Sequence, residues 1–207
     1  MNVKPLFKLM VEKKASDLFF APFAPAKIKI DGKIMPVNNL EMTPKMVKQA
    51  AIELMDEEQL DQFTKELELD FAISEPGLGR FRVNVFHQRG NVSMVLRYIT
   101  AELPTLDELG MPEQMKELVM LRRGLILMVG ATGSGKSTTL AAMINHRNEK
   151  TSSHIITVED PIEFLHPNKQ SIVNQREVGL DTVSYARALK SAMRAAPDVL
   201  QIGEIRD

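Results

Sequence analysis

The stretch GATGSGKSTTL, residues 130–140, constrains the fold of this chain more than any other segment. It contains the pattern G-x-x-x-x-G-K-[ST], which is matched by Gly130, Gly135, Lys136 and Ser137. The apolar run LILMVG, which ends at Gly130, has the length of a buried strand, and the residues from Lys136 onward predict a helix. The pattern therefore lies between a strand and a helix, as a phosphate-binding loop (P-loop) requires. It predicts an α/β fold for this part of the chain.

The expected ligand of this loop is a nucleoside triphosphate together with Mg²⁺. Glycines let the backbone curl so that its amide groups point at phosphate oxygens, and the helix N-terminus adds a partial positive charge. Lys136 would reach the β and γ phosphates, and the hydroxyl of Ser137 would bind Mg²⁺. The alternative is a glycine-rich turn that only caps a helix. The residues expected to contact the nucleotide are Gly130, Ala131, Thr132, Gly133, Ser134, Gly135, Lys136, Ser137 and Thr138.

Two acidic strand ends are candidates for the chemistry of hydrolysis. The apolar run in DVLQIGEIRD is followed by Glu204, whose carboxylate could hold the water shell of Mg²⁺ or polarise an attacking water. HIITVEDPIEF carries Glu159, Asp160 and Glu163, and its proline makes the chain turn before the last of these carboxylates. Solvated acids at a strand end and in a charged turn are the alternatives.

Composition gives no sign of a nucleic-acid or membrane partner. The chain has 26 Lys and Arg against 27 Asp and Glu, so its net charge is −1. It has no cysteine, which excludes disulfides and thiolate metal sites. No apolar run approaches the roughly 18 residues of a membrane span, and the N-terminus lacks the apolar core of a signal peptide. We therefore expect a soluble cytoplasmic protein. The histidines of the chain do not have the spacing of a metal site. They are His87, His146, His154 and His166.

The first hundred residues predict a small α+β domain. Apolar residues recur at helical spacing from Val3 to Val11, and AKIKIDGKIMPV alternates around the turn dipeptide Asp31-Gly32. Thr43-Pro44 and then DEEQLDQFTKELE predict two further helices. RFRVNVF and NVSMVLRYIT alternate with period two, which predicts two strands.

The second half predicts a parallel α/β sheet. AELPTLDELGMP, residues 101–112, contains two prolines and a glycine and is the expected linker. Strands and helices then alternate, which is typical of a parallel sheet. The expected order is a helix ending near Gly124, the strand 125–130, a helix from Lys136, the strand 154–160, a helix over 185–196 and the strand 199–205.

Several motifs together carry a family resemblance. ASDLFF, RFRVNVF, GATGSGKSTTLAAM, ITVEDPIEF, NQREVGLDT and APDVLQIGEIRD, in this order, resemble the type IV pilus retraction ATPases of the secretion-ATPase superfamily. LMVEKKASDLF and GKIMPV are more similar to the PilU-type accessory motor than to the PilT-type paralogue. The resemblance implies a PAS-like N-terminal domain over 1–100, followed by a RecA-like P-loop ATPase domain over 113–207. It also implies a ring hexamer whose ATP turnover drives pilus disassembly.

The resemblance also implies roles for individual residues. The family's catalytic base matches Glu163, and the glutamate that serves Mg²⁺ matches Glu204. Family members use arginines of the N-terminal domain to reach nucleotide, and the candidates are Arg80, Arg82 and Arg97. An ordinary solvated strand face is the alternative for these arginines. Gln175 and Arg176 could sense phosphate or line an interface, or they could form a polar strand end.

Compared with the family, the chain stops just after GEIRD, so the RecA-like domain is expected to be C-terminally truncated. The implied partners are further copies of the chain, a paralogous retraction ATPase and a pilus platform protein of the inner membrane. The expected location is therefore the cytoplasm, peripheral to that membrane at the pilus base. Two alternatives are an accessory nucleotide-binding subunit with little turnover of its own, and an unrelated P-loop enzyme such as a small-molecule kinase or a DNA-dependent ATPase.

Overall fold

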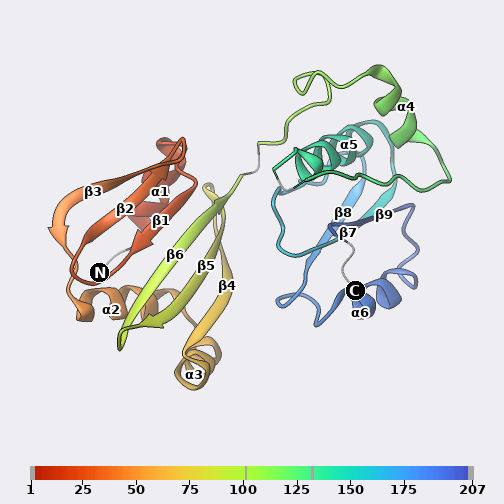
Figure 1. The fold of residues 1–207 in the computed structure, drawn as a ribbon. Coiled ribbons are helices and arrows are strands. Elements are labelled where there is room, and N and C mark those ends of the chain that lie inside the picture. The colour runs from red at the N-terminus through yellow and green to blue at the C-terminus, as the bar shows by residue number, and fades with distance from the viewer. Residues whose placement is uncertain (1–2, 101, 132, 205–207) are drawn as a thin grey trace. The chain divides into compact units, whose positions relative to one another are not determined.

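The computed structural model describes residues 3–100, 102–131 and 133–204. The chain divides into two compact units, Met1–Ile99 and Thr100–Asp207, and both mix helices with strands (Figure 1). Within the described ranges, no helix combines the length and the apolar character needed to cross a bilayer.

In its described residues, the first unit is a six-stranded sheet with three helices. All of its strand pairings are antiparallel, and the strand order is β3-β2-β1-β6-β5-β4. The sequence analysis did not predict β1 or β4 as strands. The elements are α1 (Lys4–Glu12), β1 (Asp17–Phe20), β2 (Pro25–Ile30), β3 (Lys33–Glu41), α2 (Pro44–Leu54), α3 (Glu57–Glu66), β4 (Glu68–Glu75), β5 (Gly79–Gln88) and β6 (Asn91–Ile99).

Local chemistry explains where several of these elements begin and end. Asp31 and Gly32 have φ angles of 47° and 78°, which are the left-handed conformations that a tight hairpin turn between β2 and β3 needs. The Thr43 side chain accepts a hydrogen bond from the backbone N–H of Met46 and caps α2. The predicted hairpin and the predicted helix start are therefore both confirmed.

The core of the first unit lies on the face of the sheet predicted from the alternation. Phe81, Val83 and Val85 of β5 are fully buried, whereas the residues between them are only partly buried. Phe7 of α1 stacks on Phe81, with a distance of 4.4 Å between the ring centroids. Phe7 and Met10 of this helix are buried against the apolar face of the sheet, and their burial contributes to the hydrophobic stabilisation of the unit.

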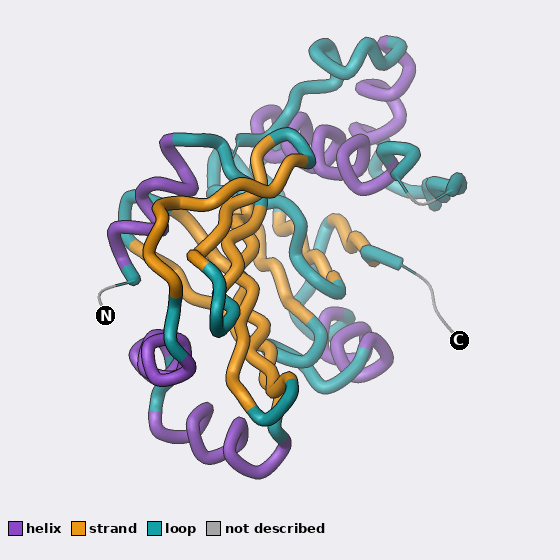
Figure 2. The backbone as a smooth tube through the Cα atoms, turned by 60° about the vertical axis from the view of Figure 1, so that its left-hand side comes forward, coloured by secondary structure: helices purple, strands orange, loops and turns teal. Residues whose placement is uncertain are grey.

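The second unit contains a three-stranded parallel sheet with strand order β8-β7-β9, as the alternation of strands and helices predicts. Helices α5 and α6 lie on opposite sides of this sheet (Figures 1 and 2). Ile144 of α5 packs against Ile155 and Val173 of the strands. The elements are α4 (Glu113–Met120), α5 (Lys136–Lys150), β7 (His154–Glu159), β8 (Ile172–Glu177), α6 (Tyr185–Ala192) and β9 (Val199–Ile202).

The predicted strand over residues 125–130 is wrong for this structure. Residues 124–131 form neither helix nor strand, and the helix before them ends at Met120 rather than near Gly124. Leu125 is 80% exposed and Val129 is 92% exposed. A strand requires a hydrogen-bonded neighbour, and the three-stranded sheet of the described residues does not include this segment. An apolar run is therefore not sufficient to form a strand here.

We predict that Phe81→Ala lowers the free energy of unfolding by about 3–5 kcal/mol, because it removes a buried ring and leaves a cavity. Phe23→Ala is the matched control, since the Phe23 side chain is 69% exposed and its loss should change stability by about 0.5 kcal/mol or less. Chemical denaturation followed by circular dichroism measures both variants. Equal losses in the two would contradict the location of the core.

Candidate functional site

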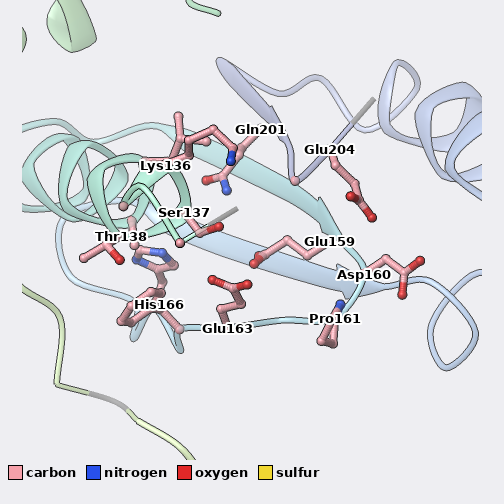
Figure 3. Close-up of a pocket in the computed structure, with 16 residues that line it drawn as sticks. Lys136, Ser137, Thr138, Glu159, Asp160, Pro161, Glu163, His166, Gln201 and Glu204 are labelled. Carbon is pink, nitrogen blue, oxygen red and sulfur yellow. The ribbon is translucent and has the colours of Figure 1, made fainter. Parts of the chain in front are cut away.

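The second unit contains a cavity of about 370 Å³ at the carboxyl ends of its parallel strands. This volume is within the range of small-molecule sites, and the carboxyl edge of a parallel sheet is where such folds bind ligands. The cavity is built by the start of α5, the ends of β7 and β9, and the loop after β7 (Figure 3). It is lined by Gly133, Gly135, Lys136, Ser137, Thr138, Leu140, Ala141, Glu159, Asp160, Pro161, Glu163, Phe164, His166, Gln201, Gly203 and Glu204.

The P-loop enters α5 through glycines, and Gly133 and Gly135 have left-handed backbone conformations that favour glycine. Gly135 precedes the first helical residue with a φ angle of 89°. At Gly130 a Cβ atom would come within 2.8 Å of the hydroxyl oxygen of Ser134, so the Ser134 side chain would have to move. Among the residues that the structure describes, no side chain caps the N-terminus of α5, and no acidic residue lies in its first turn. A helix N-terminus of this kind can bind an anion through its free amide groups.

Lys136 is folded back onto the loop that precedes it. Its Nζ donates hydrogen bonds to the carbonyl oxygens of Gly130, at 3.0 Å, and Ala131, at 2.9 Å. Because an ammonium group binds phosphate oxygens more strongly than neutral carbonyls, an incoming anion would compete for it.

The cavity includes part of the predicted P-loop set. Gly133, Gly135, Lys136, Ser137 and Thr138 line it, whereas Gly130, Ala131 and Ser134 do not. Thr132 lies outside the described residues.

Both predicted glutamates, Glu163 and Glu204, line the same cavity. In Figure 3 the side chains of Glu159, Glu163 and Ser137 point toward a common space, and Glu204 lies beyond the end of β9. Hydroxyl and carboxylate oxygens are the ligand types that Mg²⁺ prefers. The described residues contain no group of three or more His, Asp or Glu side chains placed to hold a metal by themselves.

Glu159, the last residue of β7, is a buried acid in the wall of the cavity, with 8% of its surface exposed. Burial raises the pKa of its carboxyl above the usual 4.5, because the charged form is poorly solvated. Hydrogen bonds from Thr157, Gln175 and the backbone of Glu163 oppose this rise in pKa, and the nearby charge of Glu163 adds to it. The Gln175 bond runs from Nε2 to Oε1 over 3.1 Å.

His166 is a buried imidazole in the same wall, with 8% of its surface exposed. Burial, and then the positive charge of Lys169, lower the pKa of its ring from 6.5 to about 4. The ring is therefore neutral at neutral pH. Its backbone N–H donates a hydrogen bond to Oε1 of Gln175 over 2.7 Å.

Sequence reasoning did not assign Thr157, His166 or Gln201 to the site. Gln201 lines the cavity from β9, and its register partner Thr157 donates its hydroxyl hydrogen bond to Glu159. Gln201 is the polar residue of the otherwise apolar segment VLQI, and this local signal could have identified it as a candidate. Thr157 lies two residues before Glu159 on β7, so both side chains project from the same side of the strand and the threonine is placed to donate to the acid.

The three candidate arginines belong to the first unit. Arg97 pairs with the buried Asp17, with 2.9 Å between Nε and Oδ1, and Arg82 pairs with Asp70 at 3.5 Å. Arg82 and Arg97 are direct partners across β5 and β6, and Arg80 lies on the same strand as Arg82. These ion pairs give Arg82 and Arg97 a structural role within the sheet, and the role of all three arginines toward a nucleotide stays a prediction.

Comparison with known proteins identifies relatives over the whole chain. The family model described as "Type II/IV secretion system protein" matches residues 2–207. The chain is 50% identical over 206 residues to the type IV pilus ATPase PilU of Pseudomonas aeruginosa, covering 100% of the chain and 54% of that protein. It is 42% identical over 207 residues to the type IV pilus retraction ATPase PilT of the same organism, covering 100% of the chain and 60% of PilT.

A solved structure has the same fold. The crystal structure of the pilus retraction motor PilT with bound ADP matches with a TM-score of 0.92 and 44% identity, covering 100% of this chain and 61% of that one. The chain therefore has the mixed α/β fold of a PilT-like ATPase, and it spans little more than half the length of these relatives.

We predict that the imidazole of His166 titrates with a pKa near 4 rather than 6.5. Because the folded-state pKa is the lower one, the unfolded chain binds this proton first, and stability falls as the pH drops from about 6.5 to about 4, by up to about 3 kcal/mol. Nuclear magnetic resonance of the ring resonances, assigned with His166→Gln, measures the pKa. A value near 6.5 would show that the ring is solvated.

Proposed function

We propose that this chain, which belongs to the Type II/IV secretion system protein family and is PilT/PilU-like, binds and hydrolyses ATP as a subunit of a type IV pilus motor. One observation carries the proposal: a single cavity is lined by the P-loop lysine Lys136 and by the acidic side chain of Glu163. A phosphate cradle and a candidate base thus face the same space.

Nucleotide binding starts from the N-terminus of α5. The triphosphate accepts hydrogen bonds from the amide groups of the first turn, where the helix dipole favours negative charge. The ammonium group of Lys136 then gives up its hydrogen bonds to the carbonyl oxygens of Gly130 and Ala131 and binds oxygens of the β and γ phosphates instead. Binding of ATP is therefore coupled to a rearrangement of this lysine side chain.

The side chains of Ser137 and Glu204 fit a magnesium ion that accompanies the nucleotide. Both line the cavity, and they offer a hydroxyl and a carboxylate oxygen. When bound, Mg²⁺ neutralises charge that develops on the phosphate oxygens. The two residues would hold the ion directly or through its water shell.

Glu163 acts as the general base in this proposal. Its carboxylate accepts a proton from a water molecule whose oxygen attacks the γ phosphorus, while the bond from that phosphorus to the bridging oxygen breaks. Its side chain is exposed and lines the cavity, so a water can reach it. Glu159, which is buried beside it, is less suited to this role because burial disfavours its charged form.

The assembly we propose is a hexameric ring. In it, residues 1–100 form a PAS-like domain, 101–112 a linker and 113–207 part of a RecA-like domain. Arg80, Arg82 or Arg97 would reach a nucleotide bound by a neighbouring subunit. An arginine supplied in this way is worth about 10³–10⁵ in rate, so an isolated subunit would hydrolyse ATP slowly.

The cellular role we propose is pilus retraction and hence twitching motility. The 42% identity to PilT and the likeness to the retraction motor with bound ADP support it. The ring would work in the cytoplasm against an inner-membrane platform protein at the pilus base.

A second candidate is an accessory subunit that binds nucleotide but depends on a paralogous retraction ATPase for turnover. The higher identity to PilU, 50% against 42% for PilT, favours this candidate. It requires the same P-loop contacts, since nucleotide binding is common to both.

Lys136→Ala should weaken ATP binding about 10²-fold, because one charge-assisted contact to phosphate is lost. Glu163→Gln should leave the ATP dissociation constant unchanged and lower kcat by about 10²–10⁴-fold, since only proton transfer is removed. Calorimetry and phosphate release measure the two effects on the full-length protein. Lys150→Ala, at the exposed end of α5, is the control for a lost lysine. Equal loss of binding in Glu163→Gln would contradict its role as the base.

Phosphate release at protein concentrations that span oligomer formation separates the two candidates. A motor should show a rate per subunit that rises as the oligomer forms, because each site is completed by a neighbour. An accessory subunit should bind ATP with negligible release alone and should raise the rate when mixed with a PilT-type ATPase. A concentration-independent rate with no response to mixing would contradict both.

A further inference from the structure

Strand β8 holds the loop that carries Glu163, hereafter the Glu163 loop, residues 160–166. Gln175 makes three hydrogen bonds with its side-chain amide. Its Nε2 donates to the carbonyl oxygen of Phe164, at 2.8 Å, and to Glu159, while its Oε1 accepts from the backbone N–H of His166. One side chain therefore ties the last part of the loop to the sheet.

The same face of β8 also holds the part of the loop that precedes Glu163. Glu177 is two residues after Gln175, so both side chains project from the same side of the strand. Oε2 of Glu177, which is only 2% exposed, accepts a hydrogen bond from the backbone N–H of Ile162 at 3.3 Å. The Glu159 carboxylate accepts a hydrogen bond from the backbone of Glu163 itself. Side chains of the sheet thus contact the backbone at positions 162, 163, 164 and 166.

Burial within the loop differs between Glu163 and the residues that anchor it. Ile162 is 2% exposed and His166 is 8% exposed, whereas Glu163 between them is exposed in the cavity. A surface loop is ordinarily mobile, and a carboxylate on it would sample many positions. A reacting group that is misplaced by about 1 Å can lose about 10² in rate.

We propose that Gln175 is a positioning residue, which fixes the Glu163 loop on β8 so that the Glu163 carboxylate is held at the nucleotide cavity. The inference rests on the proposed ATPase function. In this role Gln175 does not contact the nucleotide. The sequence had suggested a different role for it, the sensing of phosphate. Glu177 supports the other side of the loop in the same way.

The test compares Gln175→Leu with Asn174→Leu in the full-length protein. Asn174 is the preceding residue of β8, is exposed, and contacts His154 instead of the loop, so it controls for loss of an amide from this strand. Amide hydrogen exchange of residues 160–166 is the first measurement, because it needs no catalytic activity. Gln175→Leu should accelerate exchange in this loop about tenfold, and Asn174→Leu should not.

Kinetics is the second measurement. Gln175→Leu should lower kcat by about 10²-fold while the dissociation constant of a nonhydrolysable ATP analogue stays within about twofold, since the P-loop is untouched. A general loss of structure would instead raise exchange throughout the second unit and weaken analogue binding. If Gln175→Leu does not fold, Gln175→Asn keeps the amide but withdraws it by one methylene, and the same two measurements apply.

Two results would overturn the inference. One is amide exchange of the loop in the Gln175 variants that is no faster than in Asn174→Leu. The other is a kcat that stays at the parental value while exchange of the loop is accelerated.

Failure of the proposed function would give a different result. A parental protein that binds no ATP analogue and releases no phosphate, alone or with a PilT-type ATPase, contradicts the ATPase proposal. In that case exchange in the Glu163 loop alone decides whether Gln175 positions it.

Discussion

The parallel pairing of β7 with its two neighbours is the constraint on which the site depends. β7 pairs with β8 along its whole length, up to Glu159 opposite Glu177, and with β9 up to Val158 opposite Ile202. Because the pairing is parallel, the carboxyl ends of the three strands meet at one edge, where the N-terminus of α5 also lies. Acidic groups that are distant in sequence thereby meet the P-loop.

Electrostatics explains why such a cavity would require a cation together with its nucleotide. Its lining includes four carboxylate side chains and, among the described lining residues, one ammonium group, that of Lys136. A triphosphate entering this space is repelled by the carboxylates and attracted by the helix terminus and the lysine. A divalent cation held near these carboxylates would offset that repulsion. The same acids that disfavour a bare anion thus favour its magnesium complex.

Local chemistry made part of the fold predictable. The left-handed turn at Asp31-Gly32, the cap at Thr43 and the alternation along β5 depend on residues close in sequence, and all three were predicted. The segment 125–130 shows the opposite case. It has the apolar character of a strand, but strand formation depends on a neighbour that the described sheet does not supply.

The sequence by itself determined the phosphate loop and the acids that face it, because glycine spacing, a lysine and strand-end carboxylates are local patterns that restrict the chemistry. Only the tertiary structure decided how the acids differ. Glu159 became a buried acid with a raised pKa, while Glu163 remained exposed on a loop tied to β8 by Gln175. Burial and these hydrogen bonds arise from pairing between distant strands, and no local pattern encodes them.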